Sequence, residues 1–212
     1  MLKIKLISAM LAVILMPVSA FATIVTGSVT GGTSTGGVFE LLDPIPTGLT
    51  VGNNNQQSPN LFGFNEDQNI AITSTITVDV GTNPVNGNIV ASHYIFFDPV
   101  LTRRIIGWVD FDADIYGIIT GSANLAASDF LANTGVNYVG STLRGLEPGD
   151  SASIDPTLAN RLLIDFRAGN PGDYIRVLTM RSPRADVPEP SMIGLLGLGL
   201  LGMVALRRRK FI

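Results

Sequence analysis

The chain has 212 residues, a formal net charge of −3, no cysteine and a single histidine. The absence of cysteine excludes disulfides, thiol catalysis and cysteine metal sites, so a folded domain of this composition has to be held by its hydrophobic core. One histidine excludes a metal centre built from several histidines. Six of the 14 cationic residues lie at the two ends, so the middle is more acidic than the total charge suggests. That acidity argues against nucleic acid and anionic membranes as partners of the middle, and leaves neutral sugars, cations and proteins open.

The first 22 residues have the pattern of a secretory signal peptide. Lys3 and Lys5 form a short positive region, and an almost continuously apolar run, 6–18, follows. Ala20 and Ala22 provide the small residues of a cleavage site. The apolar run is shorter than the ~20 residues that a membrane-spanning helix needs. We therefore expect cleavage after Ala22 and export of the rest, with an uncleaved membrane anchor as the alternative.

The middle of the chain, residues 23–186, is predicted to be all-β, a single β-sandwich or jelly-roll-like domain. Short alternating runs of β-branched residues separated by turn residues are typical of that class. We expect 26–37, rich in Gly, Ser and Thr, to be a loose arm, and 52–59 to be a polar loop. Strands are predicted at 70–80, 89–97, 105–119 (a bent pair broken at Gly107 and Gly117), 162–166 and 174–180. A short helix is predicted over 125–131, capped by Ser122 or Asn124.

Three alternating aspartates, Asp110, Asp112 and Asp114, form the sharpest candidate for a metal site. At period two on a strand their carboxylates would face one side, and calcium prefers several such hard oxygen ligands. The segment lacks the glycine of an EF-hand loop, so the pattern predicts a calcium site of another kind. The alternative is a solvated strand face whose aspartates pair with Arg103 or Arg104. No other cofactor is predicted.

His93 and the aromatic residues are the remaining candidates for chemistry. His93 and Ser92 are neighbours in a predicted strand and so point to opposite faces, and the chain has no Gly-x-Ser-x-Gly elbow, which argues against a Ser–His–Asp site. A pair of carboxylates for glycan hydrolysis leaves no signature in a sequence. Trp108 could stack on a sugar, but its place inside a strand favours a role in the core. We expect no catalytic residues and no enzyme activity.

The last 26 residues, 187–212, have three parts in a fixed order. Pro188, Glu189 and Pro190 form an extended polar hinge, because the prolines exclude a helix. An uncharged run rich in glycine and leucine, 192–206, follows and predicts a short transmembrane helix. A basic stop, which the positive-inside rule places in the cytoplasm, closes the chain: Arg207, Arg208, Arg209 and Lys210.

These three parts, in this order, resemble the PEP-CTERM sorting domain of exported proteins from Gram-negative bacteria. The resemblance implies that Pro188, Glu189 and Pro190 are recognised by an exosortase at the inner membrane, and that the tail is then removed. It also implies delivery to the cell surface or to an extracellular, biofilm-type matrix. An ordinary C-terminal membrane anchor is the alternative.

The same resemblance bears on function. Hosts of such sorting systems make extracellular polysaccharide, so it implies a non-enzymatic structural or binding role in that matrix. A carbohydrate-binding module, with or without calcium, and a glycan hydrolase are the alternatives. Three segments of the middle, 65–69, 144–150 and 171–177, are similar to ectodomains of other PEP-CTERM proteins, and the last two contain a Pro-Gly-Asp turn before a strand. No activity is attached to that similarity.

Overall fold

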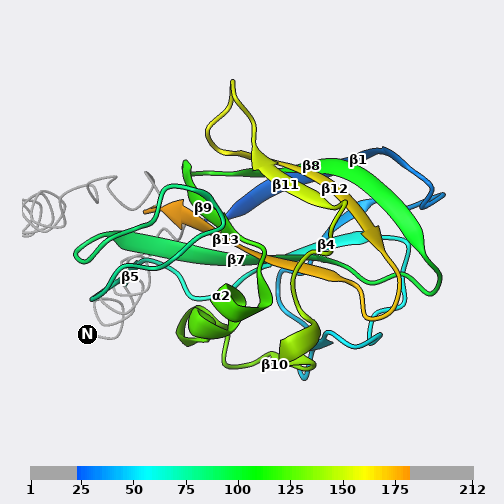
Figure 1. The fold of residues 1–212 in the computed structure, drawn as a ribbon, viewed down its shortest axis with the longest axis horizontal. Helices are drawn as coiled ribbons and strands as arrows, with labels where there is room; N and C mark the ends of the chain where they lie inside the picture. Colours follow the sequence, from blue (N-terminus) through cyan, green and yellow to red (C-terminus); the bar gives the residue numbers. More distant parts are fainter. Residues whose placement is uncertain (1–22, 182–212) are drawn as a thin grey trace, which may run out of the picture. The chain divides into compact units, whose positions relative to one another are not determined.

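The computed structural model describes residues 23–181, which belong to one compact unit (Figure 1). The predicted signal peptide and the predicted sorting tail lie outside the described residues. Strands dominate the described part of the chain, and the all-β prediction is confirmed. No helix within 23–181 is both long enough and apolar enough to cross a membrane.

The smaller of the two main sheets, sheet A, has four antiparallel strands in the order β1-β8-β12-β11. Its strands are β1 (Ile24–Gly32), β8 (Arg103–Phe111), β12 (Arg161–Ala168) and β11 (Ser151–Ile154). Burial alternates along β8 and β12, as expected for a sheet with one face on the core and one on solvent. In β12 the buried residues are Leu162, Ile164, Phe166 and Ala168.

The larger sheet, sheet B, has the strand order β2-β4-β7-β13-β9-β6, and β5 also pairs with β7. The central strands β7 (Ile89–Phe97) and β13 (Asp173–Met180) are buried along almost their whole length. Continuous burial of this kind requires cover on both faces of the sheet. The other strands are β2 (Phe39–Leu41), β4 (Leu61–Asn65), β5 (Ile70–Ala71), β6 (Val80–Gly81) and β9 (Ile115–Ile119).

Sheet A covers one face of sheet B, and a layer of helices and loops covers the other (Figure 1). One core joins the sheets and includes Phe97 of β7 and Phe166 of β12. The second core joins sheet B, through Phe64 and Tyr94, to the helical layer, through Leu125. That layer consists of α2 (Ser122–Ala127), the 3-10 turns η1 (Asp129–Leu131) and η2 (Ser141–Leu143), and the parallel pair β3 (Thr50–Val51) and β10 (Asn137–Tyr138). The third layer was not predicted from the sequence.

The expected loose arm at 26–37 was wrong, because most of it is the edge strand β1, paired with β8. Its glycines misled the prediction, since they permit close packing here rather than disorder. A Cβ atom on Gly27 would lie 2.5 Å from Cγ of Phe39, so only glycine lets that ring pack against the strand. The predicted polar loop at 52–59 is confirmed.

Two strand predictions need correction. The single strand predicted over 70–80 is only β5 and β6 at its ends, because Ile72 and Ile76 between them donate their amides to loop carbonyls, those of Asn88 and Pro84, each at 3.0 Å. The bent pair over 105–119 is real, but it breaks at residues 112–114, where the chain passes from sheet A to sheet B. Gly107 and Gly117 lie inside strands, in close contact with Ser28 and Val78.

The predicted helix is confirmed as α2 followed by η1, but its cap was wrong. The N-cap residue is Gly121, which has no side chain to accept a bond from the first turn. The carboxylate of Asp79, from a distant segment, instead fixes the chain just before the helix and one side chain of its first turn. It accepts the amides of Thr120 and Gly121 at 2.7 Å and the side-chain amide of Asn124 at 2.6 Å.

Candidate functional site

The solvent side of sheet A, called here the outer face, is the candidate binding surface. The strand register places Ser28, Trp108, Leu163 and Ser153 in one row across its four strands. Thr26, Asp110 and Arg161 form the next row. The first row combines aromatic and apolar surface with hydroxyl groups, and the second combines a hydroxyl with charged groups, at the regular spacing of a sheet.

Trp108, the only tryptophan in the chain, lies on this outer face. It is half-buried, while its strand neighbours Gly107 and Val109 are buried on the inner side. The expectation that Trp108 anchors the core was therefore wrong. A signal for this position was present in the sequence. Side chains alternate between the two faces of a strand, so Trp108 lies on the face opposite to the apolar residues Ile105, Val109 and Phe111.

Two arginine–aspartate pairs hold the polar groups of the outer face in place. Arg161 donates to both oxygens of Asp110, at 2.6 and 2.8 Å. Its guanidinium carbon also lies 4.1 Å from the centroid of the Trp108 ring, a cation–π contact. Arg104 pairs with Asp165 in the same two-pronged way, at 2.7 and 2.5 Å. Because a bidentate arginine–carboxylate pair has a fixed geometry, the side chains of both pairs are oriented in the absence of a ligand.

Hydrogen bonding within the outer-face pairs favours the charged forms of Asp165 and Arg161. Hydrogen bonding from Arg104 lowers the pKa of the Asp165 carboxyl below its ordinary value. The Asp110 carboxylate raises the pKa of Arg161 in the same manner. The Arg104–Asp165 pair is the more exposed of the two, so water and salt screen it and it contributes little to folding. The Arg161–Asp110 pair is part-buried.

The three aspartates of the predicted calcium site do not share a strand face. Only Asp110 belongs to a strand, because β8 ends at Phe111, and it is paired with Arg161 rather than with Arg103 or Arg104. Asp112 accepts the amide of Thr23 at 2.9 Å from the turn that follows β8. Within the described residues no group of three or more His, Asp or Glu is close enough together to hold a metal ion. Calcium binding by Asp110, Asp112 and Asp114 stays a prediction.

His93 is fully buried in β7, between the two sheets. Its Nδ1 lies 2.8 Å from Oδ1 of Asn65, and its Nε2 lies 3.0 Å from the hydroxyl of Thr179. The Asn65 oxygen also accepts the amide of Ile24, so Nδ1 donates to it and Nε2 accepts from Thr179. Burial lowers the pKa of His93 to about 3, which keeps the ring neutral. These bonds give His93 a structural role.

A buried ionic network, called here the buried network, lies on the opposite side of sheet B, beneath the helical layer. Its centre is the pair Glu66–Arg176, whose side chains are both fully buried and 2.6 Å apart. Glu66 also accepts the hydroxyls of Ser92 at 2.5 Å and Tyr138 at 2.7 Å. Burial, and then the charge of Glu66, raise the pKa of Tyr138 above its ordinary value, so its phenol remains a donor. Glu66 is thus saturated with donors, as a buried carboxylate must be.

The same network fastens the helical layer to sheet B. Arg176 donates to the Leu125 carbonyl at 3.1 Å and to the Ser128 hydroxyl at 2.7 Å. Asp129 accepts from Arg176 at 3.3 Å and binds Arg144 with both oxygens, at 3.0 and 2.6 Å. Glu66, Arg144 and Arg176 come from the segments 65–69, 144–150 and 171–177. These three segments therefore meet in one structural network.

Comparison with known proteins bears on the tail. The model of the PEP-CTERM protein-sorting motif matches residues 186–210. The chain carries a PEP-CTERM sorting motif. The motif contains Pro188, Glu189 and Pro190 and the arginines Arg207, Arg208 and Arg209, and it marks the chain as an exported protein sorted through the membrane by an exosortase. No curated protein and no solved structure matches the chain.

The motif covers the sorting tail and not the domain described above, so it assigns a route and leaves the role of the domain open. The tail residues lie outside the described part of the chain, as do Ala20 and Ala22 of the predicted signal cleavage site. Cleavage at Ala22 stays a prediction, and the exosortase is the one partner that the motif supports.

Proposed function

We propose that the exported domain binds extracellular polysaccharide without catalysis, through the outer face of sheet A. The observation that carries the proposal is the position of Trp108 on the solvent side of that sheet, in a row with hydroxyl groups and beside two fixed arginine–aspartate pairs. Export by a PEP-CTERM tail supports this setting, since it would deliver the domain to the cell surface or matrix of a Gram-negative cell.

The chemistry of the outer face suits a sugar. A pyranose ring has an apolar face of C–H groups and a rim of hydroxyls, so it needs an aromatic or aliphatic surface bordered by hydrogen-bonding groups. Ile106, Trp108 and Leu163 lie on adjacent strands and provide the apolar part. Arg104 and Asp165 provide donors and acceptors at its side. Because the pairs already fix these groups, little side-chain entropy is lost on binding.

Retention of the full chain on the host's extracellular polysaccharide tests the proposal. We expect the wild-type protein, purified in detergent, to be retained, and Trp108→Ala to bind at least tenfold more weakly. Phe130→Ala is the matched control, because Phe130 is a large aromatic side chain, 59% exposed, in η1 of the helical layer. It should bind as the wild type does.

The melting temperature of each variant separates lost binding from lost folding. Trp108→Ala should melt within a few degrees of the wild type, because Trp108 lies outside both cores. Equal retention of Trp108→Ala and the wild-type protein would contradict the proposal, and so would equal weakening by Phe130→Ala.

A further inference from the structure

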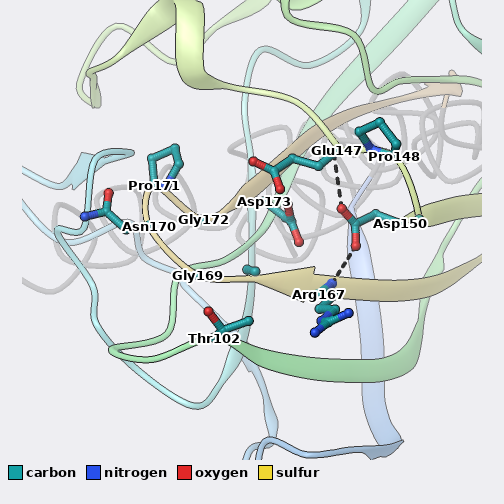
Figure 2. A pocket seen from close by; sticks show the side chains of 12 residues that line it. Thr102, Glu147, Pro148, Asp150, Arg167, Gly169, Asn170, Pro171, Gly172 and Asp173 are labelled. Atoms are coloured by element: carbon teal, nitrogen blue, oxygen red, sulfur yellow. Dashed lines mark hydrogen bonds between the residues drawn. The ribbon is translucent and has the colours of Figure 1, made fainter.

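Both Pro-Gly-Asp turns of the chain border one pocket (Figure 2). The segment 148–150 leads into β11 and the segment 171–173 leads into β13, and β12 lies between them in sequence. Since β11 and β12 are antiparallel neighbours, the start of β11 and the end of β12 meet at the same edge of sheet A. The pocket has a volume of about 400 Å³ and is lined by Thr102, residues 147–150 and residues 167–173.

Asp150 organises this pocket with its own carboxylate. One oxygen accepts the amide of Arg167 at 2.7 Å, and the other accepts the amide of Glu147 at 3.1 Å, as the dashed lines in Figure 2 show. These two bonds tie the first turn to the end of β12. Because both of its oxygens are engaged by main-chain donors, Asp150 shapes the pocket and adds negative charge to it.

Asp173 is the unexplained group in the pocket. Its residue is only 2% exposed, and its Oδ2 has no hydrogen-bond partner among the described residues. The charges that act on it are those of Asp150 and Glu147, both negative. Arg167 also lines the pocket, but no ion pair of the described residues joins it to Asp173 or Glu147. A buried carboxylate with acidic neighbours and an unpaired oxygen is costly unless a cation or a proton neutralises it.

We propose that the pocket between the two Pro-Gly-Asp turns is a calcium site, with Asp173 and Glu147 as its carboxylate ligands. Glu147 is exposed at the mouth of the pocket, and its carboxylate accepts no hydrogen bond from the described residues, so it is available to an ion that Asp173 holds. Two carboxylates rather than three agree with the absence of a three-membered acidic group within 23–181.

Calcium suits this pocket better than magnesium or zinc. Calcium takes six to eight oxygen ligands in flexible geometry, so main-chain carbonyls of the turns and water can complete its shell. Magnesium demands a near-ideal octahedron, and zinc prefers nitrogen and sulfur ligands, which the pocket lacks. Calcium sites of extracellular modules bind in the range of about 10⁻⁴–10⁻³ M, and the sorting motif sends this domain outside the cell. The proposal goes beyond polysaccharide binding and does not depend on it.

Calcium titration of the full chain, by calorimetry and by melting temperature, tests the site. We expect a single binding event with a Kd near or below about 10⁻³ M, a higher melting temperature with calcium, and no such rise with magnesium at the same concentration. Glu147→Gln is the decisive variant, since an exposed side chain can be changed without harm to the fold. It should weaken calcium binding at least tenfold, and Asp173→Asn should abolish it.

The controls are Asp112→Asn and Asp114→Asn, which alter the sequence-predicted aspartate row and should leave calcium binding unchanged. Three outcomes would overturn the proposal: no binding heat up to 10⁻² M calcium (on the order of tenfold above the extracellular range), binding that Glu147→Gln leaves intact, or binding that is lost in the Asp112 and Asp114 variants instead. The calcium readouts use no glycan, so their failure would leave polysaccharide binding standing.

Discussion

The outer face of sheet A and the buried network of sheet B use the same chemistry in opposite surroundings. On the outer face Arg104 pairs with Asp165 in water, with 50% and 32% of their side chains exposed. In the buried network Arg176 and Glu66 form an equally short pair with no exposure at all. The same arginine–carboxylate pairing therefore joins two layers of the fold in one place and only orients charged side chains on a solvent-facing surface in the other.

Breaking the buried pair should have the largest effect on stability. Arg176→Met leaves Glu66 charged and buried without its counter-ion, and it also removes the bonds to α2 and η1. We expect the free energy of unfolding to fall by about 3–5 kcal/mol, as for other buried pairs that lose one partner. Chemical denaturation of the full chain measures it.

The same substitution on the outer face provides the control. Arg104→Met should leave the denaturation midpoint unchanged within error, because the pair it breaks is solvated. Similar midpoints for Arg104→Met and Arg176→Met would remove the distinction between the two regions.

As the pH falls, protonation should lower the stability of the fold through His93, which lies between the sheets, before it affects the ion pairs of the outer face. His93 has a pKa of about 3 in the folded chain and about 6.5 when unfolded, so the folded state binds fewer protons between these values. The contribution of neutral His93 to the free energy of unfolding is fully present above about pH 6.5. It is lost as the pH falls towards 3, by about 1.4 kcal/mol per pH unit. Asp173, whose pKa is raised to about 8 by burial and then by Asp150 and Glu147, has the opposite slope between about pH 4 and 8.

Comparison of His93→Gln with the wild type isolates the histidine, because Asp173 is present in both. Denaturation at several pH values should show that the difference between the two proteins shrinks as the pH falls from 6.5 to 4. A difference that is constant over this range would show that His93 is not the titrating group.

The sequence predicted the parts of the fold that depend on local pattern. The strands at 89–97, 162–166 and 174–180 are long apolar or alternating runs, and all three are present as β7, β12 and β13. The edge strand β1 was missed because its glycine- and threonine-rich composition resembles that of a loop. The strand predicted over 70–80 was wrong because buried side chains at Ile72 and Ile76 do not require strand pairing of the backbone.

Long-range electrostatics could not be predicted. Glu66 and Arg176 are 110 positions apart, and nothing in either segment shows that the two side chains meet. The Pro-Gly-Asp turns at 148–150 and 171–173 were visible as turns, but their meeting at one pocket depends on how β11 and β12 pair. Trp108 could have been placed by its phase in the strand, which is a local signal, and so the outer face was within reach of sequence reasoning.

Trp108 offers the most direct test of polysaccharide binding at the outer face, because as the only tryptophan it reports on that face alone. The measurement is its fluorescence emission in the full chain during titration with the host's extracellular polysaccharide. We expect a saturable change in emission. The amplitude of this change should fall by half or more in Arg161→Met, which removes the cation–π partner of Trp108. Saturable binding detected by calorimetry while the emission of Trp108 stays constant would show that the polysaccharide binds elsewhere, and would contradict binding at the outer face.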